Sequence, residues 1–464
     1  MKLEQKKFFP KTGNLWHIYK TRICLFVLIF IFLAYAVFLA LFLEEGIVPD
    51  ESYRYEVSKH FSKTWGVPDN YSASYTSGID IPNNPYLGYW IFGRIINIFD
   101  LVAPSATPRQ QLVFLRIVNA IISTGTIFFC YLLAKESIPH KWWRLLPAFL
   151  LSNTLMFVFL SGGVSYDNLV NLVCFASIYY LVRVLKGKDF LSNSLGWLIN
   201  ILMGSLIKYS ILPLTLVMGI VWLAYLIKNR KVIKILAPKG IGNIFLFCLF
   251  CLIFILNLSL YGGNLLKFHS LIPSCRDTFT TEICKTSSYA IREQELALPE
   301  KLTLVQAIKQ GNPEPIRYFF DEWIREMLKR IYGIMGHKNY FPINIAYFHV
   351  AFFWVLLLSF RYIKKPDFTK ISLAAIFVFY MLVLVIMNYN TELAYGFNKY
   401  VALQGRYLFP VIGIGYVLIT HILTKTTNKL LRWGTTAALI ALFLYSGPIR
   451  FIWYYGTVFA DWFI

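Results

Sequence analysis

Charged residues are scarce in this 464-residue chain. They make up 15% of the sequence, whereas soluble domains carry about 25%, and hydrophobic residues make up 57% with a mean hydropathy of +0.56. This composition excludes an ordinary soluble protein and is typical of a polytopic membrane protein. The sequence contains neither a P-loop nor a GxGxxG motif, which argues against a nucleotide-driven machine. It also contains no cluster of histidine and cysteine with the spacing of metal ligands.

The positive charge of the chain does not indicate nucleic acid. The formal net charge of +21 comes from 45 Lys and Arg against 24 Asp and Glu. The cations fall mainly in short segments between apolar runs, and no basic domain with interleaved aromatic residues is present. The excess is therefore the positive-inside signal of a membrane protein, and no nucleic-acid partner is expected.

Eleven apolar runs predict an all-α integral membrane protein with about 11 transmembrane helices. The first run, 23–43, has roughly the 20 residues needed to cross a bilayer, and it lacks a small-x-small cleavage site, so it is expected to stay as an anchor. The basic segment 1–22 before it places the N-terminus in the cytoplasm. Alternation of sides then puts five connections inside, and every one is basic. The further runs are 110–134, 142–161, 165–185, 191–207, 210–227, 241–261, 341–360, 371–388, 407–424 and 433–449.

This topology divides the chain into membrane blocks and outer segments of a multi-pass cell-membrane protein. The blocks are helices 2–7 in 110–261 and helices 8–11 in 341–449; the outer segments are the loops 44–109 and 262–340 and the C-terminal tail 450–464. Within the first loop, residues 85–99 are expected to form a helix lying in the interface. Cys275 and Cys284 share the second loop on the oxidising side, which favours a disulfide between them.

Two adjacent carboxylates, Asp50 and Glu51, follow the first span on a segment rigidified by Pro49. Neighbouring acids at a membrane surface can serve as a catalytic base or bind a cation. They can equally be solvated loop charges. Charged residues elsewhere in the chain help to distinguish a functional role from a solvated loop charge.

Further charged residues lie at the outer ends of spans, where the positive-inside rule disfavours Lys and Arg. Taken alone, each of these charged side chains could simply extend to the lipid headgroups. Together, cations facing the loop that holds Asp50 predict a site for a membrane-embedded anion such as a lipid phosphate. These residues are Arg116, Asp167, Lys208 and Arg406.

A lipid phosphate at this surface implies a definite chemistry. A sugar linked to the lipid phosphate would be held by Lys and Arg, and the phosphate would become the leaving group. A carboxylate would deprotonate the acceptor hydroxyl, and the cations would stabilise charge on the departing phosphate. This reaction needs no nucleotide, in agreement with the missing nucleotide motifs.

Three short motifs resemble those of polytopic glycosyltransferases of the GT-C fold, including the protein O-mannosyltransferase-like and aminoarabinose-transferase-like enzymes. The nearest resemblance is to a bacterial branch of membrane proteins with P-D-E-x-x-H, S-x-D-x-x-x-N and Q-G-R-Y-x-x-P motifs, and it covers most of residues 20–425. One departure concerns the first motif, because Arg54 stands where the histidine is expected and His60 is poorly spaced to replace it. The matching residues are Pro49-Asp50-Glu51, Ser165 to Asn171 and Gln404 to Pro410.

The resemblance implies a GT-C-like bundle and a role for each candidate residue. Asp50 is expected to be the catalytic base, and Glu51 its partner, which positions the acceptor or binds a divalent cation, so metal dependence stays open. Lys208 and Arg406 are expected to contact the donor phosphate. The expected partners are a polyprenyl-phosphate sugar donor, membrane lipids, and a glycan, lipid or protein acceptor. The other expected site-lining residues are Tyr407, Tyr209, Asp167 and Arg116.

Two other classes of membrane protein compete with this interpretation. A transporter or flippase explains the spans, but it predicts internal repeats and a site near the membrane midplane, and the charges here lie at one face. An O-antigen polymerase or ligase is also polytopic. Such enzymes place key arginines mainly in a late outer loop, whereas here the acidic pair follows the first span.

Overall fold

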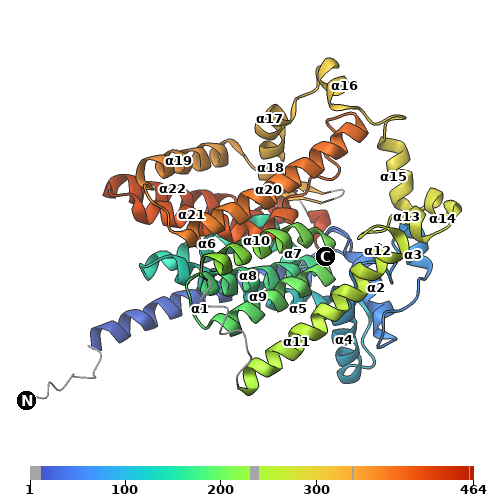
Figure 1. The fold of residues 1–464 in the computed structure, drawn as a ribbon, viewed down its shortest axis with the longest axis horizontal. Coiled ribbons are helices and arrows are strands. Elements are labelled where there is room, and N and C mark those ends of the chain that lie inside the picture. Colours follow the sequence, from blue (N-terminus) through green and yellow to red (C-terminus); the bar gives the residue numbers. More distant parts are fainter. Residues whose placement is uncertain (1–11, 230–239, 337–338, 459) are drawn as a thin grey trace, which may run out of the picture.

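The computed structural model describes residues 12–229, 240–336, 339–458 and 460–464, and within them the chain is almost entirely helical (Figure 1). The apolar helices of the bundle, of which α6 and α7 are short, are α1 (Thr12–Phe42), α5 (Pro108–Ser137), α6 (Leu145–Ser152), α7 (Leu155–Ser161), α8 (Tyr166–Leu185), α9 (Phe190–Ile207), α10 (Leu212–Lys228), α11 (Ile241–Asn257), α19 (Ala346–Tyr362), α20 (Phe368–Tyr395), α21 (Phe409–Lys425) and α22 (Lys429–Tyr445).

Shorter elements fill the segments between these helices and the end of the chain. They are α2 (Glu51–Ser62), α3 (Ser72–Ser77), α4 (Leu87–Val102), α12 (Gly263–Phe268), α13 (Cys275–Thr278), α14 (Thr281–Thr286), α15 (Ser288–Leu296), α16 (Leu304–Lys309), α17 (Pro315–Arg317), α18 (Ile324–Tyr332), α23 (Pro448–Val458) and the antiparallel strands β1 (Ile334–Met335) and β2 (Tyr340–Phe341).

The prediction of an all-α multi-pass membrane protein is confirmed. Nine helices in the described part of the chain are long and apolar enough to span a membrane, and the bent pair α6–α7 makes a tenth candidate. Helix α19, the eighth predicted span, has 17 residues. At 1.5 Å per residue it is about 26 Å long, somewhat short of the roughly 30 Å hydrocarbon core.

The third predicted span, 142–161, is not one straight helix. Its two halves, Trp142–Ser152 and Leu155–Ser161, meet at an angle of 67°. Asn153 and Thr154 stabilise the break, because the Asn153 amide donates to the Phe149 carbonyl at 2.9 Å and the Thr154 hydroxyl bonds the Leu150 carbonyl at 2.9 Å. The backbone N–H of Asn153 also donates to both of these carbonyl groups, so the side chains add bonds at a helix end that lies in an apolar environment.

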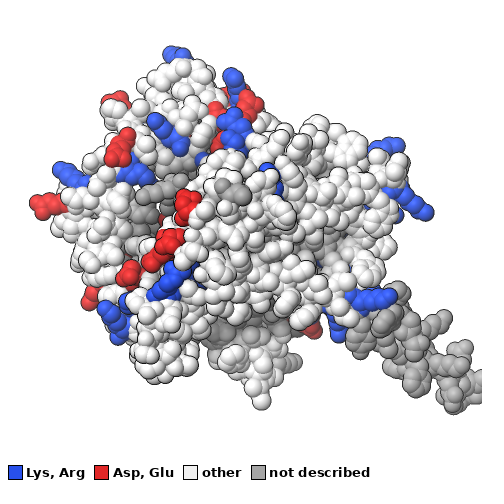
Figure 2. All heavy atoms as spheres, turned by 180° about the vertical axis from the view of Figure 1, so that it is seen from behind, with Lys and Arg blue, Asp and Glu red and all other residues white. Residues whose placement is uncertain are grey.

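Helices α8, α9 and α21 form the centre of the bundle and are mostly buried, whereas α1 and α11 lie at its outside. Figure 1 shows α11 crossing the edge of the bundle obliquely. Figure 2 shows that the middle of the visible face is nearly free of charged side chains, which gather toward its ends. This distribution is the one that a membrane-spanning bundle requires.

The two long segments that the sequence predicts to be outer loops meet at one end of the bundle, at the right of Figure 1. Helix α3 of the first segment contacts α14 and α15 of the second. Gly78, with φ +74°, allows this approach, because a Cβ there would lie 2.7 Å from the Ser287 hydroxyl. A disulfide bond joins Cys275 and Cys284 in the second segment.

The residues predicted to form an interfacial helix, 85–99, correspond to α4, which packs on α2. Gly93 makes the packing close, since a Cβ at this position would lie 2.9 Å from the Ser58 carbonyl oxygen. The far side of the helix exposes Ile98, Leu101 and Val102. An exposed apolar stripe of this kind is suited to the interface between headgroups and acyl chains.

The described basic connections lie at the opposite end of the bundle. Glu136 accepts from Lys188 at 2.7 Å, and the rings of Trp143 and Trp433 lie 5.2 Å apart. The C-terminus lies at the end that bears Asp50, where the Ile464 amide donates to the Phe42 carbonyl at 3.0 Å. The basic connection at 230–239 and the N-terminal lysines up to Lys11 lie outside the described residues.

This arrangement predicts the outcome of reporter fusions. The basic end is expected in the cytoplasm, so a fusion at Lys365 should report the cytoplasm and a fusion at Ser288 the outer side. A pair of fluorescent and alkaline phosphatase reporters measures this. A cytoplasmic Ser288 would contradict the predicted orientation and move the site described below to the inner face.

Candidate active site

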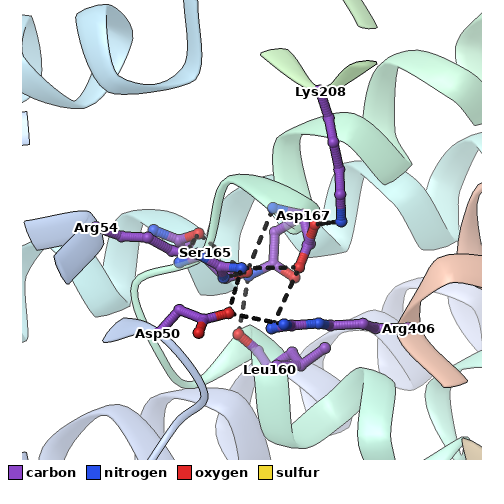
Figure 3. A network of polar contacts seen from close by, with 9 residues as sticks. Asp50, Arg54, Leu160, Ser165, Asp167, Lys208 and Arg406 are labelled. Carbon is purple, nitrogen blue, oxygen red and sulfur yellow. Dashed lines mark hydrogen bonds and ion pairs between the residues drawn. The ribbon is translucent and has the colours of Figure 1, made fainter. Parts of the chain in front are cut away.

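Five charged side chains converge at the end of the bundle where the two long segments meet, and Figure 3 shows them pointing toward one another. They come from parts of the chain far apart in sequence: the start of α2, the start of α8, the turn after α9, and the 3₁₀ turn Gly405–Leu408 before α21. The residues are Asp50, Arg54, Asp167, Lys208 and Arg406.

Asp50 is the N-cap residue of α2 and has a left-handed backbone with φ +62°. A non-glycine residue in this region costs roughly 1–3 kcal/mol, and such strain gathers at functional sites. The Asp50 carboxylate accepts from Arg406 Nη2 at 2.7 Å and from Arg54 Nη2 at 3.3 Å. Its side chain stays 33% exposed, so a ligand can reach it.

Asp167 is the buried centre of the network. Its carboxylate accepts from Lys208 Nζ at 2.5 Å and from Arg54 Nη2 at 3.2 Å, and Arg406 Nη1 lies 3.7 Å away. Ser165, the N-cap residue of α8, bonds the Asp167 amide and also accepts from Arg54. Because three cations surround it and only 4% of its side chain is exposed, Asp167 is suited to hold those cations in place rather than to accept a proton.

Arg54 connects the two carboxylates. Burial alone lowers the pKa of the Arg54 guanidinium, but the charges of Asp167 and Asp50 and the nearby Tyr166 outweigh it and raise the pKa. Arg54 is therefore a permanent cation, and its guanidinium lies 4.3 Å from the centre of the Tyr166 ring. In the sequence, Arg54 stood out only because it replaces the histidine of the motif that the chain resembles. Its i,i+4 spacing from Asp50 on one helical face was the signal for a pair.

Glu51 does not share the environment of Asp50. Its two carboxylate oxygens accept from Arg116 Nε at 2.9 Å and Nη2 at 2.6 Å, and the Val164 amide donates to it at 2.8 Å. The Glu51 and Arg116 side chains are both completely buried. Arg116 also donates to the Leu43 carbonyl at 2.7 Å, which fixes the chain where it leaves α1.

This geometry corrects two expectations. Glu51 was expected to position the acceptor or to hold a cation with Asp50, and Arg116 was expected to line the site. Both side chains are committed to each other beneath the site, so the acidic pair offers no joint cation site. The described residues contain no group of three or more His, Cys, Asp and Glu that could hold a metal ion.

A cavity of about 480 Å³ opens beside the charged network. Five residues that the sequence analysis expected at one site all line this cavity: Asp50, Lys208, Arg406, Tyr209 and Tyr407. Asp50 is the one carboxylate among the described lining residues. Lys208 Nζ lies 4.5 Å from the centre of the Tyr407 ring, and this contact holds the ammonium group at the cavity wall.

Residues from the second long segment complete the cavity, and sequence reasoning missed them. Tyr289 and Arg292 of α15 line it, and Arg292 also lines an adjoining cavity of about 270 Å³ together with Arg330 and Arg406. Burial and the charge of Asp50 raise the pKa of the Tyr289 hydroxyl, so it stays protonated. No motif marks these residues, since their place depends on how a long loop folds over the bundle.

The network carries more donors than its carboxylates use. Arg54 Nε and Arg406 Nε and Nη1 are buried and find no hydrogen-bond acceptor among the described residues. Three cations face two carboxylates, so the five side chains have a net charge of +1. Buried donors without partners are rare in proteins, and these three leave the network with donors that its own carboxylates do not use.

The fold of this chain is similar to that of solved structures, although its sequence matches no family model and no curated protein. The oligosaccharyltransferase AglB from Archaeoglobus fulgidus, solved with an inhibitory peptide and a dolichol-phosphate, aligns over 94% of this chain and 55% of its own length at 14% identity and a TM-score of 0.51. Its apo structure also gives a TM-score of 0.51. The chain has the GT-C fold.

A second solved structure is ArnT from Cupriavidus metallidurans bound to undecaprenyl phosphate. It aligns over 93% of this chain and 64% of its own length at 12% identity and a TM-score of 0.49. The chain thus spans a little more than half of AglB and less than two thirds of ArnT. The likeness to AglB confirms the predicted GT-C-like architecture.

Proposed function

We propose that this chain is a glycosyltransferase that moves a sugar from a polyprenyl-phosphate donor to a hydroxyl of a glycan, lipid or protein acceptor at the outer face of the membrane. The observation that carries the proposal is the excess of cations around Asp50 at the cavity wall. A phosphodiester carries one negative charge, which matches the net charge of +1. The likeness to AglB, which was solved with a dolichol-phosphate, supports a lipid-phosphate donor.

The reaction is a single displacement at the anomeric carbon. Asp50 takes the proton of the acceptor hydroxyl, and that oxygen forms a bond to the anomeric carbon. The bond between this carbon and the donor phosphate oxygen breaks, and the phosphate leaves with the electron pair. One accessible carboxylate suits this scheme, because a covalent route would need a second carboxylate as nucleophile.

The cations have distinct parts in this scheme. Lys208 and Arg406 hold the donor phosphate, and Asp167 and Arg54 keep them oriented. Departure of the phosphate as a monoester adds negative charge. Arg292 makes no ion pair with any described residue and lines the same cavity, so it can supply the additional positive charge.

Removal of either phosphate-binding cation is expected to weaken donor binding. Lys208→Ala and Arg406→Ala should each cost about 1.5–3 kcal/mol, which is about 10- to 150-fold in the dissociation constant. Arg406→Lys should also be impaired, because lysine lacks the guanidinium fork. Titration of purified protein with a polyprenyl-phosphate sugar measures the effect, and Lys285→Ala, an exposed cation outside the cavity, is the matched control. Unchanged affinity in both alanine variants would mean that the phosphate binds elsewhere.

Lipid analysis of a deletion strain tests the function. Loss of the protein should cause a polyprenyl-phosphate sugar to accumulate and should remove one sugar from a surface glycan, glycolipid or glycoprotein. Expression of the wild-type protein should return the donor pool to its normal level and bring back the missing sugar. Expression of Asp50→Asn should do neither. A deletion that leaves the donor pool and all surface glycans unchanged would contradict the proposal. A donor that accumulates only in the inner leaflet would indicate a flippase instead.

A further inference from the structure

A second charged cavity lies at the far end of the bundle from Asp50. It measures about 210 Å³ and lies between the start of the apolar part of α1, the end of α5 and the turn that precedes α6. About 20 residues of α1 separate Arg22 in this cavity from the exit of α1, a distance of about 30 Å. The lining residues are Thr21, Arg22, Tyr131, Lys135, Lys141 and Arg144.

The charge of this cavity is unbalanced. Four of its lining residues are cations, and none of the described lining residues is acidic. Arg22, Lys135, Lys141 and Arg144 form no ion pair with a described residue. The nearby carboxylate of Glu136 is already paired with Lys186 and Lys188. Four like charges around one hollow repel each other, and an anion bound there would relieve the repulsion.

One of the cations is held in place before any ligand binds. Arg144 Nε donates to the Ile138 carbonyl and Nη2 donates to the Pro139 carbonyl, both at 2.8 Å. These bonds also satisfy carbonyl groups just beyond the end of α5. A preorganised guanidinium loses little freedom when it binds a phosphate.

The cavity lies at the depth of lipid headgroups. Trp142 and Trp143 follow directly on the lining residue Lys141, and Trp143 packs against Trp433 with ring centres 5.2 Å apart. Trp142 and Trp433 are more than half exposed. Tryptophan gathers at the boundary between headgroups and acyl chains, so the four cations face the phosphate layer of the membrane.

We propose that this cavity binds the phosphate headgroup of an anionic membrane lipid in the leaflet opposite to the active site. Basic pockets between transmembrane helices on the cytoplasmic side recognise such headgroups, with the cations contacting phosphate and the apolar flank contacting acyl chains. Trp142, which is exposed and directly follows the lining residue Lys141 in the chain, offers apolar surface for such contacts. The proposal is independent of the reaction proposed for the Asp50 cavity.

Titration with defined lipids tests the proposal. Native mass spectrometry of the full-length protein in detergent should give a dissociation constant for dioleoyl-phosphatidylglycerol and much weaker binding of dioleoyl-phosphatidylcholine. Lys135→Gln with Lys141→Gln should weaken phosphatidylglycerol binding about 30-fold, because each cation near the headgroups contributes about five-fold. Lys364→Gln with Lys365→Gln removes the same charge from an exposed basic connection and should have little effect.

A single variant and a competition with a soluble phosphate complete the test. If the double variant does not fold, the single exposed replacement Arg22→Gln should still weaken binding about five-fold. Glycerol 1-phosphate should not displace the lipid at equal concentration. Equal losses in the pocket and control variants would show that only general surface charge acts, and displacement by glycerol 1-phosphate would show a site for a soluble anion. Either result would overturn the proposal.

Discussion

Asp50→Asn is expected to lower the rate of sugar transfer by about 10²- to 10⁴-fold, the usual contribution of a positioned general base. Asparagine keeps the size of the side chain and can still accept from Arg406 and Arg54, but it cannot take a proton from the acceptor hydroxyl. The protein should still insert in the membrane and bind the donor. A transfer assay with labelled polyprenyl-phosphate sugar measures the rate.

The matched control for this experiment is Asp69→Asn, which changes an exposed acid in the same outer segment and should leave the rate unchanged. A chelator added to wild-type protein should have no effect if Asp50 acts without a cation. Near-normal transfer by Asp50→Asn would mean that Asp50 only pairs with Arg406 and Arg54 and takes no proton from the acceptor. That result would remove the mechanism proposed here.

Arg116→Met is expected to destabilise the protein by about 3–5 kcal/mol, because it leaves the Glu51 carboxylate completely buried without its partner. Met keeps the apolar volume but none of the bonds to Glu51 and to the Leu43 carbonyl. Adding Glu51→Gln to Arg116→Met should recover part of the loss, since the unpaired charge is then gone. Thermal unfolding in detergent measures both, as a double-mutant cycle.

This second experiment separates the two neighbouring acids. Glu51→Gln alone should lower the unfolding temperature, and the activity of the folded fraction should stay close to wild type. Asp50→Asn should leave the unfolding temperature close to that of the wild type and should lower the activity of the folded protein. A Glu51→Gln protein of normal stability that transfers sugar as slowly as Asp50→Asn would show that Glu51 takes part in the reaction and that the assignment made from its burial is wrong.

The fold could be read from the sequence because two strong signals act over whole segments. Apolar runs of membrane-spanning length define the helices, and the basic connections assign their ends to two sides. The same signals predicted that Asp50, Asp167, Lys208 and Arg406 lie at one end of the bundle. The bend between α6 and α7 escaped prediction, because the polar residues Ser152, Asn153 and Thr154 interrupt a long apolar run only briefly.

The roles of individual acids and bases depended on geometry that no local pattern contains. Asp50 is the left-handed N-cap residue of α2 and Glu51 is the first residue of the helix, so the two side chains point in different directions. Asp50 faces the cavity, and Glu51 faces Arg116. Arg116 and Asp167 both lie at the end of the bundle that bears Asp50, yet only Asp167 joins the network. Arg292 was missed because a loop of many residues carries it over the cavity.

The release of polyprenyl phosphate from the donor tests the central claim most directly. Purified wild-type protein in lipid vesicles, given the donor pool extracted from a deletion strain and an acceptor-containing membrane extract, is predicted to release polyprenyl phosphate as the sugar reaches the acceptor. Asp50→Asn should bind the donor and release none. Wild-type protein that leaves the sugar–phosphate bond intact, including any that only moves the donor across the vesicle membrane, would contradict the account.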